Sequence, residues 1–233
     1  MKNAIAIIPA RGGSKRIPRK NIKLFQGKPL IAYSIQTALT SKLFNRVIVS
    51  TDDAEIAKIA QEYGAEVPFM RSNKLADDFS SSGDVVADAI KKLQEMGEKL
   101  EYVCTLYATA PFIQEKYLKE GLSKLQNSDA RMAFSVTSMP FPIQRTFKIT
   151  PNERCQMFTP HNFLSRSQDL EEAYQDAGQF YWEKVQQEVK DITFGSESIP
   201  IVLPRYLVQD IDTPEDWEIA EILYEVLEKK ALV

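Results

Sequence analysis

The sequence predicts an α/β protein, a Rossmann-like domain of three layers in which helices cover both faces of a mostly parallel sheet. Three observations support this fold class. Short β-branched runs alternate along the chain with segments whose apolar residues recur at helical spacing. The first run, Ala4–Pro9 (AIAIIP), is apolar on both faces, as the central strands of parallel sheets are. A chain of 233 residues with 44% hydrophobic and 26% charged residues has the size and composition of one globular domain.

The first 137 residues contain four such β-runs, and helical segments follow each of the first three. We expect the strands at Ala4–Pro9, Arg46–Ser50, 102–107 and 132–137. We expect the helices at about 29–41, 56–63, 85–96 and 117–125. Pro29 suits a first helical turn, and Gly64 ends the second helix. Right-handed crossovers between successive units predict parallel strands with helices on both faces.

The segment from about 139 to 176 breaks this rhythm. It contains four prolines, little periodicity and too many residues for a plain connection. We therefore expect one domain over 1–233 with an inserted arm at about 139–178. Regular structure is expected to resume at 178–182 and again at 205–210. A last helix should begin with Thr213 as its N-cap and Pro214 at its first position.

Charge is distributed unevenly along the chain. The first 51 residues carry ten Lys and Arg and no Asp or Glu, whereas the remaining residues carry a net charge of −13. A sequence pI near 5.4 argues against a general nucleic-acid coat protein, which would be basic throughout. The cationic first fifth therefore indicates a small anionic ligand.

Other features exclude several classes of protein. No apolar run approaches the roughly 20 residues of a membrane span, and the opening apolar stretch is too short for a secretory signal. Cys104 and Cys155 offer no disulfide framework, so we expect a reducing cytoplasm. The single histidine, His161, cannot build a multi-histidine metal site, and it is expected to be a surface residue of the arm.

A cationic loop that contains two glycines follows the first strand. Gly12 and Gly13 allow the backbone to approach a ligand closely, so that amide N–H groups line a phosphate. Five cations surround this position: Arg11, Lys15, Arg16, Arg19 and Lys20. The Walker A and GxGxxG patterns are both absent. The loop predicts a triphosphate site, and the alternative is a solvated or RNA-binding basic segment.

A pair of acids, Asp210 and Asp212, stands near the C-terminus. On a strand, residues i and i+2 point to the same side, so the two carboxylates would face one ligand. Such a pair can share Mg²⁺, which prefers carboxylate and phosphate oxygens. Taken alone, the pair is more typical of exposed turn acids. Together with the cationic loop, it is better explained as a metal-binding pair.

These motifs resemble the CMP-N-acetylneuraminate synthetase family, the cytidylyltransferases that activate nine-carbon sialic acid-like sugars. The family-level motifs are IIPARGGSKRIPRKN at 7–21, GKPLIAYSI at 27–35, VIVSTDD at 47–53 and DIDTPEDW at 210–217. Four others favour the pseudaminic acid cytidylyltransferase branch: YATAPF at 107–112, PIQR at 142–145, SRSQDL at 165–170 and DAGQFYW at 176–182. The resemblance spans essentially the whole chain. It implies a nucleotidyltransferase fold with a protruding dimerisation arm.

The resemblance also implies a reaction and its residues. The anomeric 2-hydroxyl of the sugar would attack the α-phosphorus of CTP and release pyrophosphate. The implied nucleotide-binding residues are Ala10, Arg11, Gly12, Gly13, Ser14, Lys15, Asn21, Arg71 and Ser82, with Arg11, Lys15 and Lys20 as catalytic residues. Asp210 and Asp212 would bind Mg²⁺. The implied sugar-binding residues are Tyr107, Thr109, Gln144, Arg145, Arg166 and Gln179. The arm would form a homodimer and reach the partner's sugar site, without any nucleic acid or membrane partner.

The chain departs from the sialic acid enzymes at two sugar-contacting positions. They carry QPTSP where this chain has YATAP at 107–111, and an arginine where Gln175 stands. N-acetylneuraminate is therefore disfavoured, and Arg145 or Arg166 would replace the lost cation against the sugar carboxylate. The alternatives are CTP-dependent activation of legionaminic acid, N-acetylneuraminate or 3-deoxy-manno-octulosonate, and, more distantly, a non-enzymatic RNA-binding domain.

Three further residues have ordinary explanations. Asp52 and Asp53 close the second strand at the ligand edge, and for them helix capping is at least as well supported as substrate contact. Cys104 lies in an apolar strand and is expected in the core.

Overall fold

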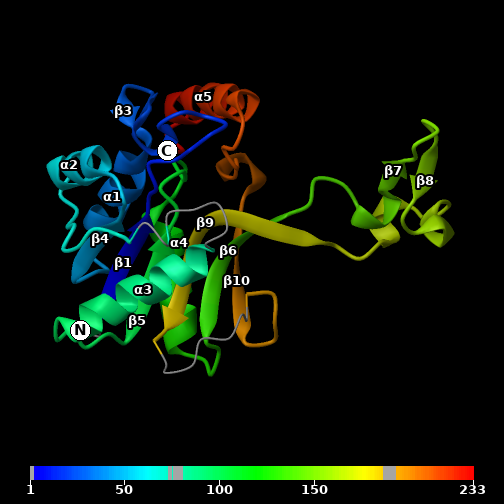
Figure 1. The fold of residues 1–233 in the computed structure, drawn as a ribbon. Helices are drawn as coiled ribbons and strands as arrows, with labels where there is room; N and C mark the ends of the chain where they lie inside the picture. Colours follow the sequence, from blue (N-terminus) through cyan, green and yellow to red (C-terminus); the bar gives the residue numbers. More distant parts are fainter. Residues whose placement is uncertain (1–2, 73–74, 76–80, 186–192) are drawn as a thin grey trace.

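The computed structural model describes residues 3–72, 75, 81–185 and 193–233. Its centre is a six-stranded sheet in the order β10-β6-β9-β5-β1-β4. The strands are β1 (Ala4–Pro9), β4 (Arg46–Ser50), β5 (Tyr102–Leu106), β6 (Met132–Ser138), β9 (Tyr174–Lys184) and β10 (Ser198–Leu203). β9 runs antiparallel to both of its neighbours, and the other pairings are parallel. The predicted fold class of a mostly parallel sheet is thus confirmed (Figure 1).

Successive residues of β1 point to opposite faces of the sheet, and because they are apolar, helices cover both faces. Ala4, Ala6 and Ile8 belong to the core beneath α1 (Leu30–Ser41), α2 (Ala54–Glu62) and α4 (Glu115–Gln126). Ile5 and Ile7 pack instead against α3 (Ser82–Glu95) on the other face. α5 (Pro214–Lys229) packs against Phe25 and Tyr33 near the short hairpin of β2 (Leu24–Phe25) and β3 (Lys28–Pro29).

Local signals explain where these helices begin. Ser81 and Thr213 form capping boxes with Asp84 and Asp216, and so start α3 and α5. Asp53 accepts hydrogen bonds from the amides of Glu55 and Ile56 and thereby caps α2, which is one of the two roles expected for it.

One expected element differs from the structure, and one strand was not expected from the sequence. Residues 205–210 contain a 3₁₀ turn, Arg205–Leu207, and then irregular chain, so the regular segment extending to 210 is wrong. The strand β10 lies earlier, at Ser198–Leu203, and the sequence pattern missed it because Pro200 argues against a strand interior. Proline is tolerated there because β10 is an edge strand.

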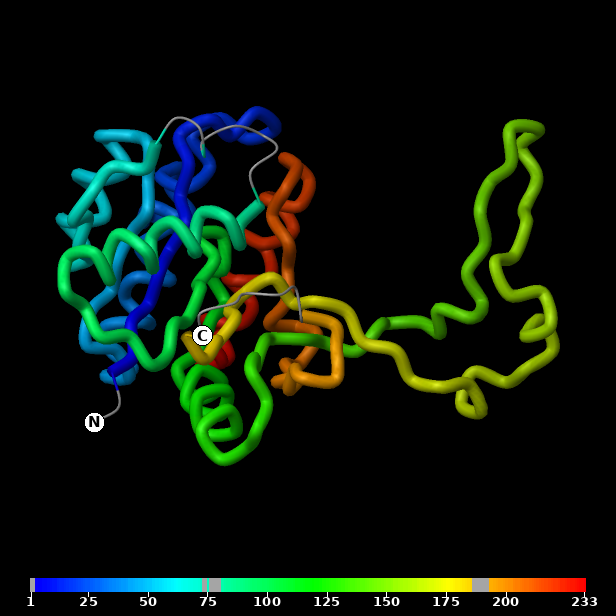
Figure 2. The backbone as a smooth tube through the Cα atoms, turned by 60° about the horizontal axis from the view of Figure 1, so that its bottom comes forward, coloured from blue at the N-terminus to red at the C-terminus, as the bar shows by residue number. Residues whose placement is uncertain are grey.

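An arm leaves the sheet between β6 and β9 and stands away from the body of the molecule (Figures 1 and 2). It begins where Ser138 pairs with Tyr174, and it carries the hairpin of β7 (Phe147–Ile149) and β8 (Cys155–Met157). His161 lies in a 3₁₀ turn of this arm and is exposed, as expected for a surface residue. The inserted segment predicted at about 139–178 is therefore seen as a protruding arm, whose last residues belong to β9.

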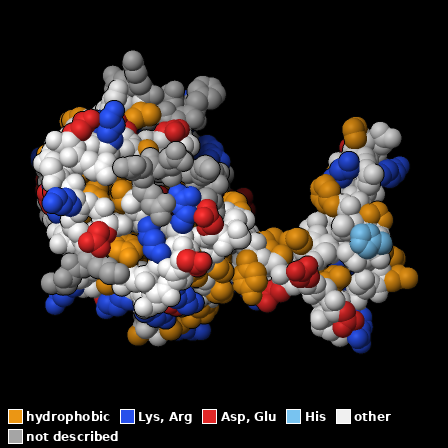
Figure 3. Space-filling view, turned by 90° about the horizontal axis from the view of Figure 1, so that it is seen from below, with side chains coloured by type: hydrophobic (Ala, Val, Ile, Leu, Met, Phe, Trp, Pro, Cys, Tyr) orange, Lys and Arg blue, Asp and Glu red, His pale blue; other side chains and the backbone are white. Residues whose placement is uncertain are grey.

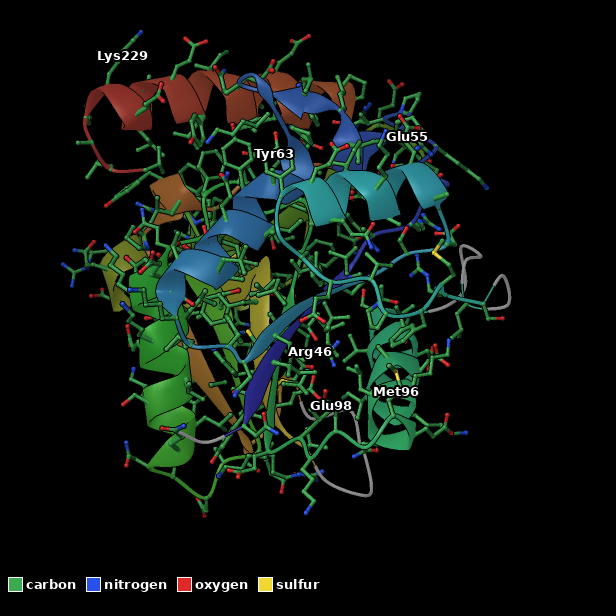
Figure 4. All side chains as sticks on the ribbon, turned by 90° about the vertical axis from the view of Figure 1, so that its left-hand side faces the viewer. Arg46, Glu55, Tyr63, Met96, Glu98 and Lys229 are labelled. Atoms are coloured by element: carbon green, nitrogen blue, oxygen red, sulfur yellow. The ribbon has the colours of Figure 1, made fainter. Side chains whose placement is uncertain are left out.

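Charged residues close the end of the sheet opposite the cationic loop. Arg46, at the start of β4, donates hydrogen bonds to Glu98 at 2.6 Å and to Glu66 at 2.5 Å, and Figure 4 shows Arg46 and Glu98 beside each other.

Cys104 is buried in β5, and burial raises the pKa of its thiol. Among the described residues, no helix has both the length and the apolar character that crossing a membrane requires.

Candidate active site

A pocket of 630 Å³ lies at the carboxyl ends of β1 and β5, where open α/β sheets bind their ligands. It brings together most of the residues predicted for the nucleotide and the metal. The predicted residues that line it are Arg11, Ser14, Lys15, Lys20, Asn21, Arg71, Ser82, Tyr107, Thr109, Asp210 and Asp212. Ala10, Gly12 and Gly13 belong to the same loop but do not line the pocket.

The loop after β1 is held by hydrogen bonds to its own backbone and to β4. Ala10 N donates to Ser50 O at 3.0 Å, and the buried Asn21 donates from Nδ2 to Arg11 O at 2.9 Å. Asn21 thereby shapes the loop from behind, because its amide ties the second half of the loop to the first.

Gly12 is required by a close approach rather than by an unusual dihedral angle. A Cβ atom at this position would lie 2.6 Å from Asp53 Oδ2, which is closer than real Cβ contacts allow. Asp53 is in turn engaged by Arg19, which also donates to Glu55 at 2.6 Å. Arg19 is thus committed to the start of α2, so one of the five loop cations serves the loop's structure and not the pocket.

Asp52 joins two parts of the pocket that are distant in the sequence. Its Oδ1 accepts a hydrogen bond from Gly12 N at 3.1 Å and another from Arg71 Nη2 at 3.0 Å. Arg71 is buried, and its Nε has no hydrogen-bond partner among the described residues. A buried guanidinium N–H of this kind calls for an acceptor, which a bound ligand or a water can supply. This bridging role of Asp52 differs from both helix capping and substrate contact, the two roles expected from its position, and its substrate contact stays a prediction.

The two acids Asp210 and Asp212 lie on irregular chain before α5, not on a strand as the spacing argument assumed. They still face the same pocket, because the intervening Ile211 is fully buried in the core beneath α5. Burial and then the nearby charge of Asp212 raise the pKa of Asp210. For Asp212, burial opposes ionisation, but Lys20 and Arg16 outweigh it and lower the pKa.

Lys20 and Arg16 are the cations that contact the acid pair. Lys20 Nζ lies 3.1 Å from Asp212 Oδ1 and donates to Ile211 O at 2.5 Å. Arg16 Nη2 lies 2.7 Å from Asp212 Oδ2. The cationic loop and the acid pair are therefore in direct contact. The sequence indicates Arg16 only as one charge of the loop, and its contact with Asp212 makes it a further residue of the site.

The predicted sugar-binding residues fall into two groups. Tyr107 and Thr109 line the pocket. Gln179 is buried in β9 and donates to Leu207 O at 2.5 Å, while its Oε1 has no partner among the described residues. It therefore ties β9 to the segment that leads to the acids, and its predicted contact with a sugar remains a prediction.

The other three, Gln144, Arg145 and Arg166, lie on the arm and do not line this chain's pocket. Gln144 donates to Glu171 O at 3.0 Å, and its Oε1 is buried without a partner among the described residues. Arg166 is paired with Asp169 at 2.7 Å. Their roles also remain predictions.

A smaller hollow of 150 Å³ adjoins the main pocket and shares Ser82 and Tyr107 with it. Its walls include apolar side chains of α3 and β6, among them Val86, Ile90 and Met132. Glu183 also borders it, and burial raises the pKa of this carboxyl group. No sequence motif pointed to this hollow, because its lining comes from helix and strand residues that look like ordinary core.

Comparison of the sequence with known proteins gives three findings. Residues 5–194 match the family model described as Cytidylyltransferase. The chain is 48% identical over 232 residues, covering 99% of it and 100% of the relative, to a pseudaminic acid cytidylyltransferase of Campylobacter jejuni. It is 35% identical over 237 residues, covering 98% of it and 99% of the relative, to a CMP-N,N'-diacetyllegionaminic acid synthase of Legionella pneumophila.

A solved structure supports the fold. It is CMP:2-keto-3-deoxy-manno-octonic acid synthetase complexed with CTP, with a TM-score of 0.69. The match covers 97% of this chain and 99% of that one at 18% sequence identity, so it speaks for the fold alone.

Proposed function

The chain belongs to the cytidylyltransferase family, and we propose that it joins CTP to a nonulosonic, sialic acid-like sugar, pseudaminic acid, to give the CMP-sugar and pyrophosphate. The observation that carries this proposal is the shared pocket, in which the loop cations and the acid pair face one space. A triphosphate needs the cations, and a divalent ion bound to it needs the carboxylates. The family and the nucleotidyltransferase activity follow from full-length similarity, and the identity of the sugar is the proposal.

In this proposal Arg11, Lys15 and Lys20 surround the triphosphate, and the buried Arg71 offers its Nε–H to the nucleoside part. The 2-hydroxyl oxygen of the sugar forms a bond to the α-phosphorus while the bond to the bridging oxygen of the β-phosphate breaks. The hydroxyl proton is lost, and pyrophosphate leaves. Cations fixed around the phosphates stabilise the charge that develops on the leaving group.

Asp210 and Asp212 are proposed to hold Mg²⁺ together with phosphate oxygens. Among the described residues no group of three or more His, Cys, Asp and Glu is placed to hold a metal ion, so the protein offers these two carboxylates. That donor set suits an ion that retains water and phosphate ligands. When bound, Mg²⁺ would neutralise phosphate charge, and Lys20 would orient Asp212.

The sugar is proposed to lie beside Tyr107 and Thr109, next to the apolar hollow. That hollow suits a sugar with apolar acyl substituents better than one with hydroxyl groups at every position. Gln144, Arg145 and Arg166 are proposed to act on the sugar site of a partner subunit, since they lie on the arm and away from their own pocket. The arm would then make the protein a homodimer of single-domain subunits, working in the cytoplasm, where CTP is available.

The test supplies the purified protein with CTP, Mg²⁺ and one sugar at a time, and measures pyrophosphate release and the mass of the product. The panel is pseudaminic acid, N,N'-diacetyllegionaminic acid, N-acetylneuraminate and 3-deoxy-manno-octulosonate. We expect kcat/KM to be highest for pseudaminic acid by at least about tenfold, a difference of about 1.4 kcal/mol. Asp212→Asn should abolish most of the turnover, and UTP and ATP should replace CTP poorly.

Faster turnover of another sugar on the panel would replace pseudaminic acid as the substrate. Absence of pyrophosphate release with every sugar would reject the proposed acceptor class. RNA affinity that falls steeply with salt and is unaffected by Asp210→Ala would support the non-enzymatic alternative.

A further inference from the structure

Both carboxylate oxygens of Asp212 are occupied by cations of the loop. Oδ1 lies 3.1 Å from Lys20 Nζ, and Oδ2 lies 2.7 Å from Arg16 Nη2. A metal ion that bound this carboxylate would therefore have to share it with two cations or displace one of them. Like charges at such short range repel strongly, so displacement is the less costly outcome.

The two cations differ in how firmly they are held. The Lys20 side chain is 15% exposed, and it also donates to the carbonyl of Ile211 at 2.5 Å. The Arg16 side chain is 63% exposed, and its hydrogen bond among the described residues goes to Asp212. Exposed ion pairs contribute little free energy, so Arg16 is the cation that leaves at low cost.

Arg16 has an obvious second partner, because it lines the same pocket as Arg11 and Lys15. A guanidinium group binds phosphate oxygens through two parallel hydrogen bonds, which a single exposed carboxylate contact does not offer here. We propose that Arg16 is a nucleotide-binding residue that exchanges partners: it pairs with Asp212 in the nucleotide-free protein and with the triphosphate when CTP and its metal ion bind. This inference rests on the proposed function.

The exchange predicts effects of opposite sign when Arg16 is replaced. Asp212 would lose a competing cation, so a divalent ion alone should bind the nucleotide-free protein more tightly. The triphosphate would lose a cation, so CTP should bind more weakly. If Arg16 merely maintained the shape of the loop, its replacement would weaken the binding of both the divalent ion and CTP.

The experiment measures Mn²⁺ binding to the nucleotide-free protein by electron paramagnetic resonance, and CTP binding without metal by calorimetry. Arg16→Gln is expected to tighten Mn²⁺ binding about three- to tenfold and to weaken CTP binding by a similar factor. Lys58→Gln is the matched control, since Lys58 is an exposed cation on α2 whose carboxylate partner is Glu62, outside the pocket. It should change neither affinity. In the Asp212→Asn background, Arg16→Gln should no longer affect Mn²⁺ binding.

An Arg16→Gln protein of unchanged Mn²⁺ affinity, or one in which both affinities fall, would overturn the exchange. Thermal unfolding of each variant identifies a general loss of structure. A variant that loses structure and binds both ligands more weakly would also count against the exchange. A wild-type protein that bound Mn²⁺ but not CTP would reject the proposed function itself. That result appears before any variant is compared, so the two failures are distinguishable.

Discussion

At the scale of single residues, Asp52 connects the loop to the buried arginine. One carboxylate oxygen accepts from Gly12 N and from Arg71 Nη2, so the positions of the cationic loop and of Arg71 depend on one another. The sequence placed Asp52 at the ligand edge but could not assign it this role, because its two partners lie far away along the chain. An acid at a strand end can cap a helix, bind a ligand or position a neighbour, and only tertiary contacts distinguish these.

Asp52→Ala is expected to raise the KM for CTP about tenfold or more with a smaller effect on kcat, because Arg71 would lose the carboxylate that orients it. Asp52→Asn should cost less, since its amide oxygen can still accept. Steady-state kinetics of Asp52→Ala, Arg71→Gln and the double variant provide the check. The double variant should be scarcely worse than Arg71→Gln alone, and additive losses would contradict a role exerted through Arg71.

Asp53 has a pH-dependent effect on stability. The hydrogen bond from Arg19, with help from the amides of Ile56 and Glu55, lowers the pKa of Asp53 from 3.8 to about 2. A depressed pKa stabilises the folded state fully above the unfolded-state value near 4, and that contribution is lost as the pH falls through about 2.

Asp53→Asn keeps a side chain that can cap α2 but removes the charge. We expect it to lower the free energy of unfolding by about 1 kcal/mol at pH 7, since the pair is partly exposed. Urea denaturation at a series of pH values should show this difference shrinking between pH 4 and pH 2. Asp53→Ala should lose about 1 kcal/mol more, through the cap, at every pH. An Asp53→Asn difference that persisted undiminished to pH 2 would contradict the assignment.

At the scale of elements, the sequence was most informative where a local signal decides the structure. The helices begin close to where periodicity and capping residues place them, as Thr213 and Asp216 show for α5. The antiparallel direction of β9 and the edge strand β10 have no local signature, because strand direction is set by the whole sheet. Pro200 even argued against β10, since only its edge position permits it.

The arm is the element whose surface most needs a partner. Seven large apolar side chains between 141 and 164 are exposed: Phe141, Ile143, Phe147, Ile149, Phe158, Phe163 and Leu164. Figure 3 shows hydrophobic side chains gathered along the arm. Exposed apolar groups at this density are typical of an interface between proteins. This agrees with the proposal that two subunits join through their arms.

Replacing Phe147 and Phe163 together by Asp is expected to convert a dimer into a monomer, because each substitution would place a charge in the apolar contact. Sedimentation equilibrium measures the change, and the KM for the sugar should rise in the same variant. Ile222→Asp, on the exposed face of α5, is the control and should remain dimeric. A wild-type protein that is monomeric at micromolar concentration would contradict the proposed assembly.

At the scale of the whole molecule, the uneven charge of the chain is explained by where its ends meet. The loop near the N-terminus and the acids near the C-terminus line one pocket, and Arg16 and Lys20 contact Asp212 directly. The sequence predicted both the cationic loop and the acid pair from their residue types. It could not predict that Arg19 is occupied by Asp53, or that Arg16 is paired with the acid, since both facts depend on side-chain contacts across the fold.

The arm also has an origin that matters for how such proteins can vary. It leaves and re-enters the body at adjacent residues of one antiparallel pair, Ser138 and Tyr174. Because these residues are already paired across two neighbouring strands, the chain between them can lengthen, shorten or be exchanged without altering the register of the sheet behind it. The junction of β6 and β9 is thus a position where an inserted segment can change without changing the sheet. A different arm inserted there would leave the pocket at the ends of β1 and β5 unchanged, so the surface that the arm presents can vary independently of that pocket.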